Sequence, residues 1–329
     1  MKKLNLHTVA APVLLTLLAF TPGKTVLVGG DNIGFGLKPD GVIVSGTYDL
    51  DTGHGIYNPD KDSDIKKGDL ITHIGGSKVT TLDDLNTSLS QLQAGSIDLV
   101  LKRNSKAVSR TLKVYEIKGR YKTGLYVKER VLGIGTLTYY DPETKTYGAL
   151  GHEVKESYGT EPLAIESGRI YESEVIGVKK SSDGKVGEKV ATLNETKVLG
   201  DVIKNTEYGI YGHMSAVPSD AKTYKLAKAS EVKKGKATVF TVLDGNVKES
   251  FTIEITDLKD PSYVSTKGIT FRIDDKELLA KTNGVVSGMS GSPIVQGDYL
   301  IGALTHIMVN DCDHGYGVYI EHMFNMLSD

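Results

Sequence analysis

The sequence predicts a mainly β protein with two folded domains. Short runs rich in Val, Ile, Thr and Tyr recur along most of the chain, and its 37 glycines supply tight turns between them. A length of 329 residues corresponds to about two domains. The chain contains neither a repeating βαβ spacing nor a nucleotide-binding loop, so we expect a mainly β rather than an α/β architecture.

Charge and cysteine content exclude several classes of function. The formal net charge is −2 and no basic run stands out, so we expect no nucleic-acid partner. The one cysteine, Cys312, cannot form an intrachain disulfide. Asp311 and Asp313 flank it, and their charges would raise the pKa of the thiol. We therefore predict that Cys312 packs in a loop and is not a nucleophile.

Residues 1–24 predict a signal peptide or an N-terminal membrane anchor. Lys2 and Lys3 precede an apolar run from Val9 to Phe20 that Pro12 interrupts. This is the usual pattern of an export signal, and the run is shorter than the roughly 20 residues that span a bilayer as a helix. We expect a protein that is exported across the cytoplasmic membrane or anchored to it. The alternative is a hydrophobic first strand or helix.

Residues 25–117 are expected to form the first domain. Apolar residues at positions 82, 85, 89 and 92 have helical spacing. Before them, residues 63–79 indicate a helix, a Gly-Asp turn, a strand, a Gly-Gly turn and a second strand. This stretch resembles a bacterial PDZ domain, which is a peptide-binding module.

The PDZ resemblance implies where a peptide would bind. It places the loop that holds a peptide's terminal carboxylate on Ile33, Gly34, Phe35 and Gly36, and the following strand would offer an edge for β-addition. Asn32 stands where such loops have their first glycine, so binding of a free carboxylate is left open. The alternative is a purely structural PDZ domain that packs on the second domain.

Residues 118–329 carry the features of a nucleophilic hydrolase. Ser290 lies between Gly288 and Gly291 in a Gly-Met-Ser-Gly-Ser-Pro segment. Such a turn exposes a serine Oγ and brings backbone N–H groups to the reacting carbonyl. His152 ends an upstream glycine-rich segment, and Asp275 lies between the two. The order His, Asp, Ser is that of chymotrypsin-like serine proteases, so we expect a double β-barrel here.

The residues after Ser290 support this fold. Residues 294–305 indicate a hairpin whose second strand begins the substrate-pairing edge, so we expect Thr305 and His306 on that edge. Residues 315–320 resemble the last barrel strand, and residues 321–327 fit a short terminal helix.

With these motifs in view, the whole chain resembles the stage IV sporulation protein B serine peptidases of endospore-forming bacteria. Residues 148–152, 284–293 and 305–318 carry the resemblance. It implies His152 as general base, Ser290 as nucleophile and Asp275 as the residue that orients the histidine, with Asp274 as a competitor. A Gly-Gly-Ile-Val-Gln-Gly run usually precedes the family's serine, whereas this chain has Asn-Gly-Val-Val-Ser-Gly.

Each residue has a role in this scheme. Ser290 Oγ attacks the scissile carbonyl, His152 transfers the proton, and the N–H groups of Gly288 and Ser290 form the oxyanion hole. His213, in a similar glycine setting, is an alternative base. The acids and histidines between residues 311 and 322 match no zinc spacing, so we expect no metal and no cofactor.

The resemblance also implies a biological setting. The chain would be an exported endopeptidase of sporulation, acting between mother cell and forespore. It would cleave a membrane-associated or secreted regulator of an intramembrane protease, and also itself, while the PDZ domain binds a peptide or protein. Two alternatives stay open: a PDZ scaffold with an inactive peptidase domain, and a quality-control protease of the envelope that degrades many unfolded substrates.

Overall fold

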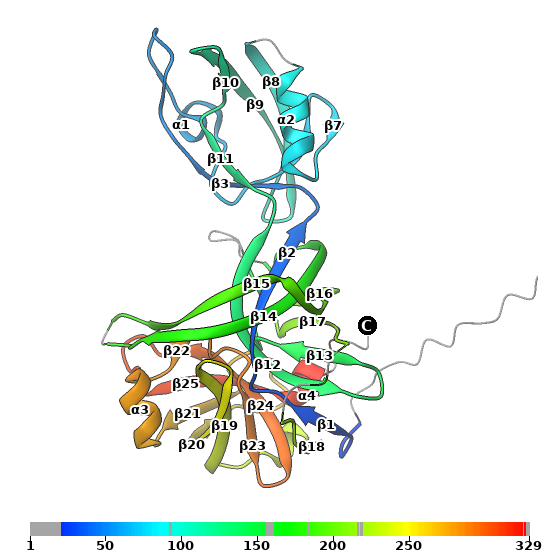
Figure 1. Ribbon diagram of the computed structural model, residues 1–329, viewed down its shortest axis with the longest axis vertical. Coiled ribbons are helices and arrows are strands. Elements are labelled where there is room, and N and C mark those ends of the chain that lie inside the picture. Colours follow the sequence, from blue (N-terminus) through cyan, green and yellow to red (C-terminus); the bar gives the residue numbers. More distant parts are fainter. Residues whose placement is uncertain are drawn as a thin grey trace, which may run out of the picture.

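The computed structural model describes residues 21–91, 94–155, 161–182, 184–215, 217, 220–324 and 326. These residues form a large β unit and a small β unit, joined where β2 leads to β3 and β11 leads to β12 (Figure 1). Most of the predicted export segment lies outside the described residues. Within them, every helix is too short or too polar to cross a membrane.

One half of the large unit is a closed barrel. Its strands pair in the cyclic order β24–β23–β19–β20–β21–β25 and back to β24. Buried side chains such as Phe251, Phe271 and Leu304 form its core. The elements are β19 (Gly235–Asp244), β20 (Val247–Leu258), β21 (Ile269–Ile273), α3 (Lys276–Thr282), β23 (Pro293–Gln296), β24 (Tyr299–Ile307), β25 (His314–Tyr319) and α4 (Ile320–Phe324).

The other half is a barrel-like sheet in the order β22–β15–β14–β2–β12–β1–β18, which β18 connects to β24; β13, β17 and β16 continue from β12. The elements are β1 (Thr25–Val28), β2 (Asn32–Pro39), β12 (Val131–Asp141), β13 (Thr146–Ala149), β14 (Ile165–Lys179), β15 (Gly187–Asp201), β16 (Lys204–Thr206), β17 (Gly209–His213), β18 (Thr223–Leu226), η1 (Ala229–Glu231) and β22 (Val286–Ser287). The two halves together confirm the predicted mainly β, chymotrypsin-like fold.

The small unit is a separate sheet in the order β10–β9–β8–β6–β3–β11, with β7 beside β6. Its core contains Leu85 from the one long helix, α2, at the predicted position. The elements are β3 (Val42–Thr47), β4 (Leu50–Asp51), β5 (Ile56–Tyr57), α1 (Pro59–Ser63), β6 (Leu70–Ile74), β7 (Ser77–Lys78), α2 (Leu82–Ser90), β8 (Gly95–Arg103), β9 (Lys106–Ile117), β10 (Arg120–Lys122) and β11 (Leu125–Lys128).

The structure corrects the predicted position of the peptide-binding loop. Ile33, Gly34, Phe35 and Gly36 lie within β2, a buried strand whose edges pair with β12 on one side and β14 on the other. Because both edges are already hydrogen-bonded, β2 neither forms a carboxylate loop nor accepts an added strand. That prediction was wrong.

The same pairings move the domain boundary. β1 pairs with β12 and β18, so residues 25–39 complete the large unit although they come first in the sequence. The small unit extends from β3 to β11, residues 42–128, and is inserted into the large unit. The chain therefore does not divide at residues 25–117 and 118–329 as predicted.

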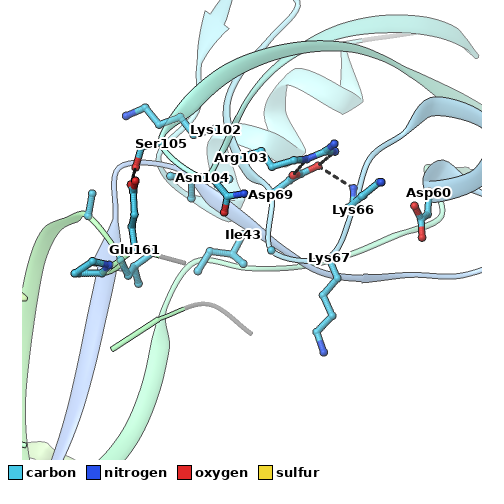
Figure 2. A pocket seen from close by; sticks show the side chains of 15 residues that line it. Ile43, Asp60, Lys66, Lys67, Asp69, Lys102, Arg103, Asn104, Ser105 and Glu161 are labelled. Atoms are coloured by element: carbon cyan, nitrogen blue, oxygen red, sulfur yellow. Dashed lines mark hydrogen bonds and ion pairs between the residues drawn. The ribbon is translucent and has the colours of Figure 1, made fainter. Parts of the chain in front are cut away.

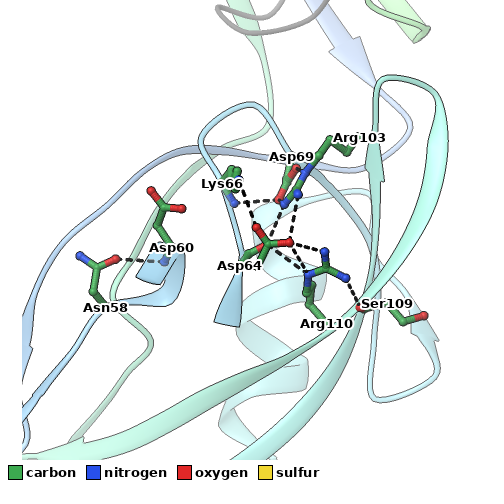
Figure 3. Close-up of polar contacts among 8 residues, drawn as sticks. All are labelled: Asn58, Asp60, Asp64, Lys66, Asp69, Arg103, Ser109 and Arg110. Carbon is green, nitrogen blue, oxygen red and sulfur yellow. Dashed lines mark hydrogen bonds and ion pairs between the residues drawn. The ribbon is translucent and has the colours of Figure 1, made fainter. Parts of the chain in front are cut away.

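The Gly-Asp turn of the small unit has a structural explanation. The Asp69 side chain is 1% exposed, and its carboxylate accepts hydrogen bonds from Arg103 Nε at 2.7 Å and from a second Arg103 nitrogen at 2.8 Å. Arg103 and Arg110 also donate to Asp64 (Figure 3). The Arg110 hydrogen bond holds the pKa of Asp64 well below its ordinary value. A bidentate pair of this kind ties the turn to β8, so this motif stabilises the small unit.

Candidate active site

The turn that carries Ser290 is held by β12. Thr136 N–H donates to Ser290 O at 2.9 Å, and Thr136 Oγ1 donates to Gly288 O at 3.0 Å. Thr138 Oγ1 donates to Gly291 O at 2.7 Å. A Cβ on Gly291 would lie 2.1 Å from Thr136 O, and the residue has a φ of +91°. The close packing on β12 therefore requires the second glycine of the motif.

The turn that carries His152 lies against the same strand. After β13, Leu150 has a φ of +71° and its N–H donates to Thr136 O at 3.2 Å. Gly151 follows with a φ of +70°, and a Cβ there would lie 2.9 Å from Thr305 Cγ2. These contacts bring the predicted histidine and serine segments together, although 138 positions separate the two residues in the sequence.

The segment after His152 is fixed by a residue that the sequence did not single out. Asn205 Nδ2 donates to Val154 O at 2.8 Å and to Leu163 O at 2.9 Å, while Asn205 Oδ1 accepts from Val154 N–H at 2.9 Å. A side-chain amide that bridges two loop segments has no local sequence signal, because its partners are backbone groups.

Ser290, Thr305, His306 and His152 form one cluster. Ser290 Oγ donates to Thr305 O at 3.1 Å, and the rings of His152 and His306 have centroids 5.4 Å apart. In the described chain, the hydroxyl of Ser290 is directed to Thr305 and no hydrogen bond joins it to His152. Rotation about the Cα–Cβ bond of Ser290 moves Oγ between staggered positions. A hydrogen bond between a nucleophile and its general base often forms only when substrate is bound.

The hydrogen bond of His152 defines its tautomer. Nδ1 lies 2.8 Å from Glu153 O, and a carbonyl can only accept, so Nδ1 carries the proton. Nε2 of the neutral ring is then the basic nitrogen. Burial lowers the pKa of His152, and the hydrogen bond to Glu153 O opposes this shift. The imidazole is consequently neutral around pH 7.

Asp275 lies away from the cluster of Ser290 and His152. Its Oδ1 accepts from the N–H groups of Glu277 and Leu278, at 2.9 Å and 3.0 Å, and its Oδ2 accepts from Thr252 N–H at 3.1 Å. It is thus the N-cap of α3. Desolvation raises the pKa of its carboxyl, but the backbone hydrogen bonds outweigh this effect and the net shift is downward.

Strand register gives the separation between Asp275 and the cluster. His306 pairs with Tyr316, and Tyr316 pairs with Thr270 on β21. Asp275 lies five positions past Thr270, on the order of 15 Å along the strand direction. Its neighbour Asp274 forms an ion pair with Lys236. The structure brings neither aspartate to His152.

The oxyanion-hole prediction falls on the Ser290 turn. Met289 N–H donates to Val286 O at 3.2 Å, and Gly291 N–H donates to Leu304 O at 2.8 Å. Among the described residues, the Ser290 N–H between them donates to no backbone carbonyl. That N–H is a donor available to a ligand.

Thr305 and His306 lie where β24 passes the end of β23. β23 pairs with β24 only up to Pro293 and Ala303, whereas β25 pairs with the other edge as far as Ile307. Burial, together with the nearby His152, lowers the pKa of His306 to about 4, so His306 is neutral around pH 7. The prediction of a substrate edge here is compatible with this pairing.

Other candidate residues have ordinary structural positions. Cys312 is buried, with Sγ 3.4 Å from Ser182 O. His213 is on an exposed strand end beside Asp201. Asp311, Asp313 and His314 are the one group of possible metal ligands among the described residues, but His314 Nδ1 already pairs with both carboxylates, at 3.0 Å and 2.8 Å.

A cavity of about 500 Å³ lies between the small unit and residues 161–164 of the large unit (Figure 2). Its polar side chains are largely paired. Arg103 bonds Asp69, and Ser105 donates to Glu161. The cavity does not include Ser290 or His152.

The comparison with known proteins agrees with the geometry. The family model described as SpoIVB peptidase S55 matches residues 119–324, which is more than half of the chain. No curated protein matches the sequence. The matched region contains both turns of the cluster and all of the closed barrel, so the chain belongs to the SpoIVB peptidase S55 family and is a serine peptidase.

Proposed function

We propose that Ser290 is the nucleophile and His152 the general base of this peptidase. The observation that carries the proposal is the bridge through Thr136, which binds Ser290 O and the N–H of Leu150, two residues before His152. Nε2 of His152 takes the proton of Ser290 Oγ as the hydroxyl attacks the scissile carbonyl. The Ser290 N–H, together with that of Gly288, receives the developing oxyanion.

We expect Ser290→Ala and His152→Ala each to abolish labelling of the full chain by a fluorophosphonate probe. Loss of either residue should lower the rate by about 10⁴-fold or more, because nucleophile and base act as a unit. Labelling is read by mass spectrometry, with His213→Ala as the control that retains labelling. Labelling that persists in Ser290→Ala would mean that another residue is the nucleophile, and a wild-type chain that is not labelled would favour the inactive scaffold.

The pH dependence of the labelling rate should report the protonation of the His152 imidazole. The base must be neutral, and burial lowers its pKa below the ordinary 6.5. The rate should therefore fall as the pH is lowered, with a midpoint below 6.5. The Glu153 carboxylate raises the pKa of His152, so Glu153→Gln should move the midpoint to still lower pH. A midpoint above 6.5 in the wild-type protein would contradict the buried neutral base.

Asp275→Asn distinguishes two roles of this residue. The family resemblance implies a triad carboxylate, whereas the structure shows the N-cap of α3. Asparagine caps a helix about as well as aspartate, so folding should be retained, with a lower melting temperature because the amide NH2 group cannot accept the hydrogen bond from Thr252 N–H. If Asp275 is a helix cap, the variant should be labelled at a rate within about tenfold of the wild-type rate. If Asp275 is the triad carboxylate, the amide should lower the labelling rate about 10⁴-fold. Thermal unfolding measured on the same samples verifies that both proteins are folded.

The biological setting is part of the proposal. Membership of the family supports a sporulation-related serine peptidase with a protein substrate. We propose that it acts outside the cytoplasm, between mother cell and forespore, on a membrane-associated regulator, and that it cleaves itself. Lys2, Lys3 and the apolar run after them support export. Selective cleavage of one or a few proteins would distinguish it from a quality-control protease.

The small unit supports a second function, peptide binding, at a position other than β2. β11 is the last strand of its sheet and pairs with β3 alone among the described strands. Leu125 and Val127 of β11 and Leu89 of α2 are partly buried around one core. PDZ domains add an extended peptide to an open sheet edge, so we propose that the predicted PDZ-like ligand binds at β11.

Phage-displayed peptides with random C-terminal residues provide a test of this edge. We expect the wild-type chain to enrich peptides with apolar C-terminal residues, and Leu89→Lys to remove the enrichment because it puts a charge on the core that Leu125 and Val127 of β11 also contact. Asp83→Lys, on an exposed position of the same helix, is the matched control. Equal enrichment by Leu89→Lys and by the wild-type protein would exclude this groove.

A further inference from the structure

A buried lysine lies behind the turn that carries Ser290. Lys189 of β15 is 3% exposed, and its Nζ donates to Thr241 Oγ1 at 2.8 Å and to Thr136 Oγ1 at 3.5 Å. No carboxylate among the described residues forms an ion pair with it. Lysines are almost never buried without a charged partner, because an ammonium group loses its hydration there.

Keeping this amine in the interior destabilises the fold. Burial lowers the pKa of Lys189 to about 7, so folding opposes the charge that the side chain carries in water. An apolar side chain of similar length would avoid this cost. A buried group that lowers stability is typical of functional sites, where activity and stability compete.

Thr136 connects Lys189 to the turn. The single proton of Thr136 Oγ1 is donated to Gly288 O at 3.0 Å, which leaves a lone pair of that oxygen for Lys189 Nζ. The lysine stem also packs directly on the turn. A Cβ built on Gly288 would lie 3.2 Å from Lys189 Cβ and 3.3 Å from its Cδ.

We propose that Lys189 is a positioning residue for the peptidase reaction. Acting through the Thr136 hydroxyl, it fixes the Gly288 carbonyl and with it the orientation of the N–H groups that receive the oxyanion. Donors of an oxyanion hole stabilise the transition state only when they are already aimed at the developing charge. The inference rests on the proposed role of Ser290.

Lys189→Met tests the proposal, because methionine retains much of the stem and removes the amine. For fluorophosphonate labelling of the full chain, we expect the maximal rate to fall about 10- to 100-fold, since loss of one oxyanion donor outright costs 10²- to 10³-fold. The probe concentration for half-maximal rate should stay unchanged. The melting temperature should stay the same or rise, which a merely structural role of Lys189 would not allow.

Thr136→Val tests the connection. It removes the hydroxyl but keeps the N–H that donates to Ser290 O. We expect the maximal labelling rate to fall by about the same factor as in Lys189→Met. The double variant with both changes should lose little more, because both interrupt the same connection to Gly288 O. Thr241→Val removes the other partner of Nζ and is the matched control, because no hydrogen bond among the described residues joins the Thr241 side chain to the turn.

Three results would overturn the inference. The first is a wild-type labelling rate in Lys189→Met, and the second is a Lys189→Met protein that unfolds or melts at a lower temperature in proportion to its lost activity. The third is a double variant whose labelling rate falls by the product of the two single effects. A wild-type protein that is not labelled at Ser290 would instead overturn the proposed function.

Discussion

A single residue of β12 determines the geometry of the site. The N–H and C=O groups of a strand residue point to the same edge, so one residue can bind two segments side by side. Thr136 does this: its N–H binds Ser290 O and its C=O binds Leu150 N–H, while its side chain binds Gly288 O. Any change that shifts β12 would move the serine and histidine turns together, whereas a change in one turn alone would separate them.

Close packing around this strand explains the glycines at the site. Gly291 lies so near Thr136 O and Leu150 N that no side chain fits, and a Cβ on Gly151 would lie 2.9 Å from Thr305 Cγ2. Leu150 has a left-handed backbone conformation, which costs energy for a residue with a Cβ. The hydrogen bond from Leu150 N–H to β12 and the burial of the leucine side chain offset the cost of this conformation.

Sequence and structure agree where the signal is local. The glycine turns around His152 and Ser290 are visible in the sequence because backbone conformation and tight packing restrict the residue type. Strand pairing is not local: residues 33–36 have the composition of a PDZ loop, yet β12 and β14 pair with both edges of that strand. Lys189 was also missed, since an alternating strand shows which positions face inward only when its partner is known.

The partner of His152 shows why chemical roles are harder to predict than positions. Asp275 has the expected residue type and sequence order, but three backbone N–H groups occupy its carboxylate. Glu153 O fixes the tautomer instead, and a carbonyl has no sequence signature. A neutral carbonyl offers less stabilisation to the imidazolium that forms during proton transfer than a carboxylate does. The Glu153 side chain, 15% exposed, lies near enough to raise the pKa of His152, so one residue supplies both the orienting carbonyl and the compensating charge.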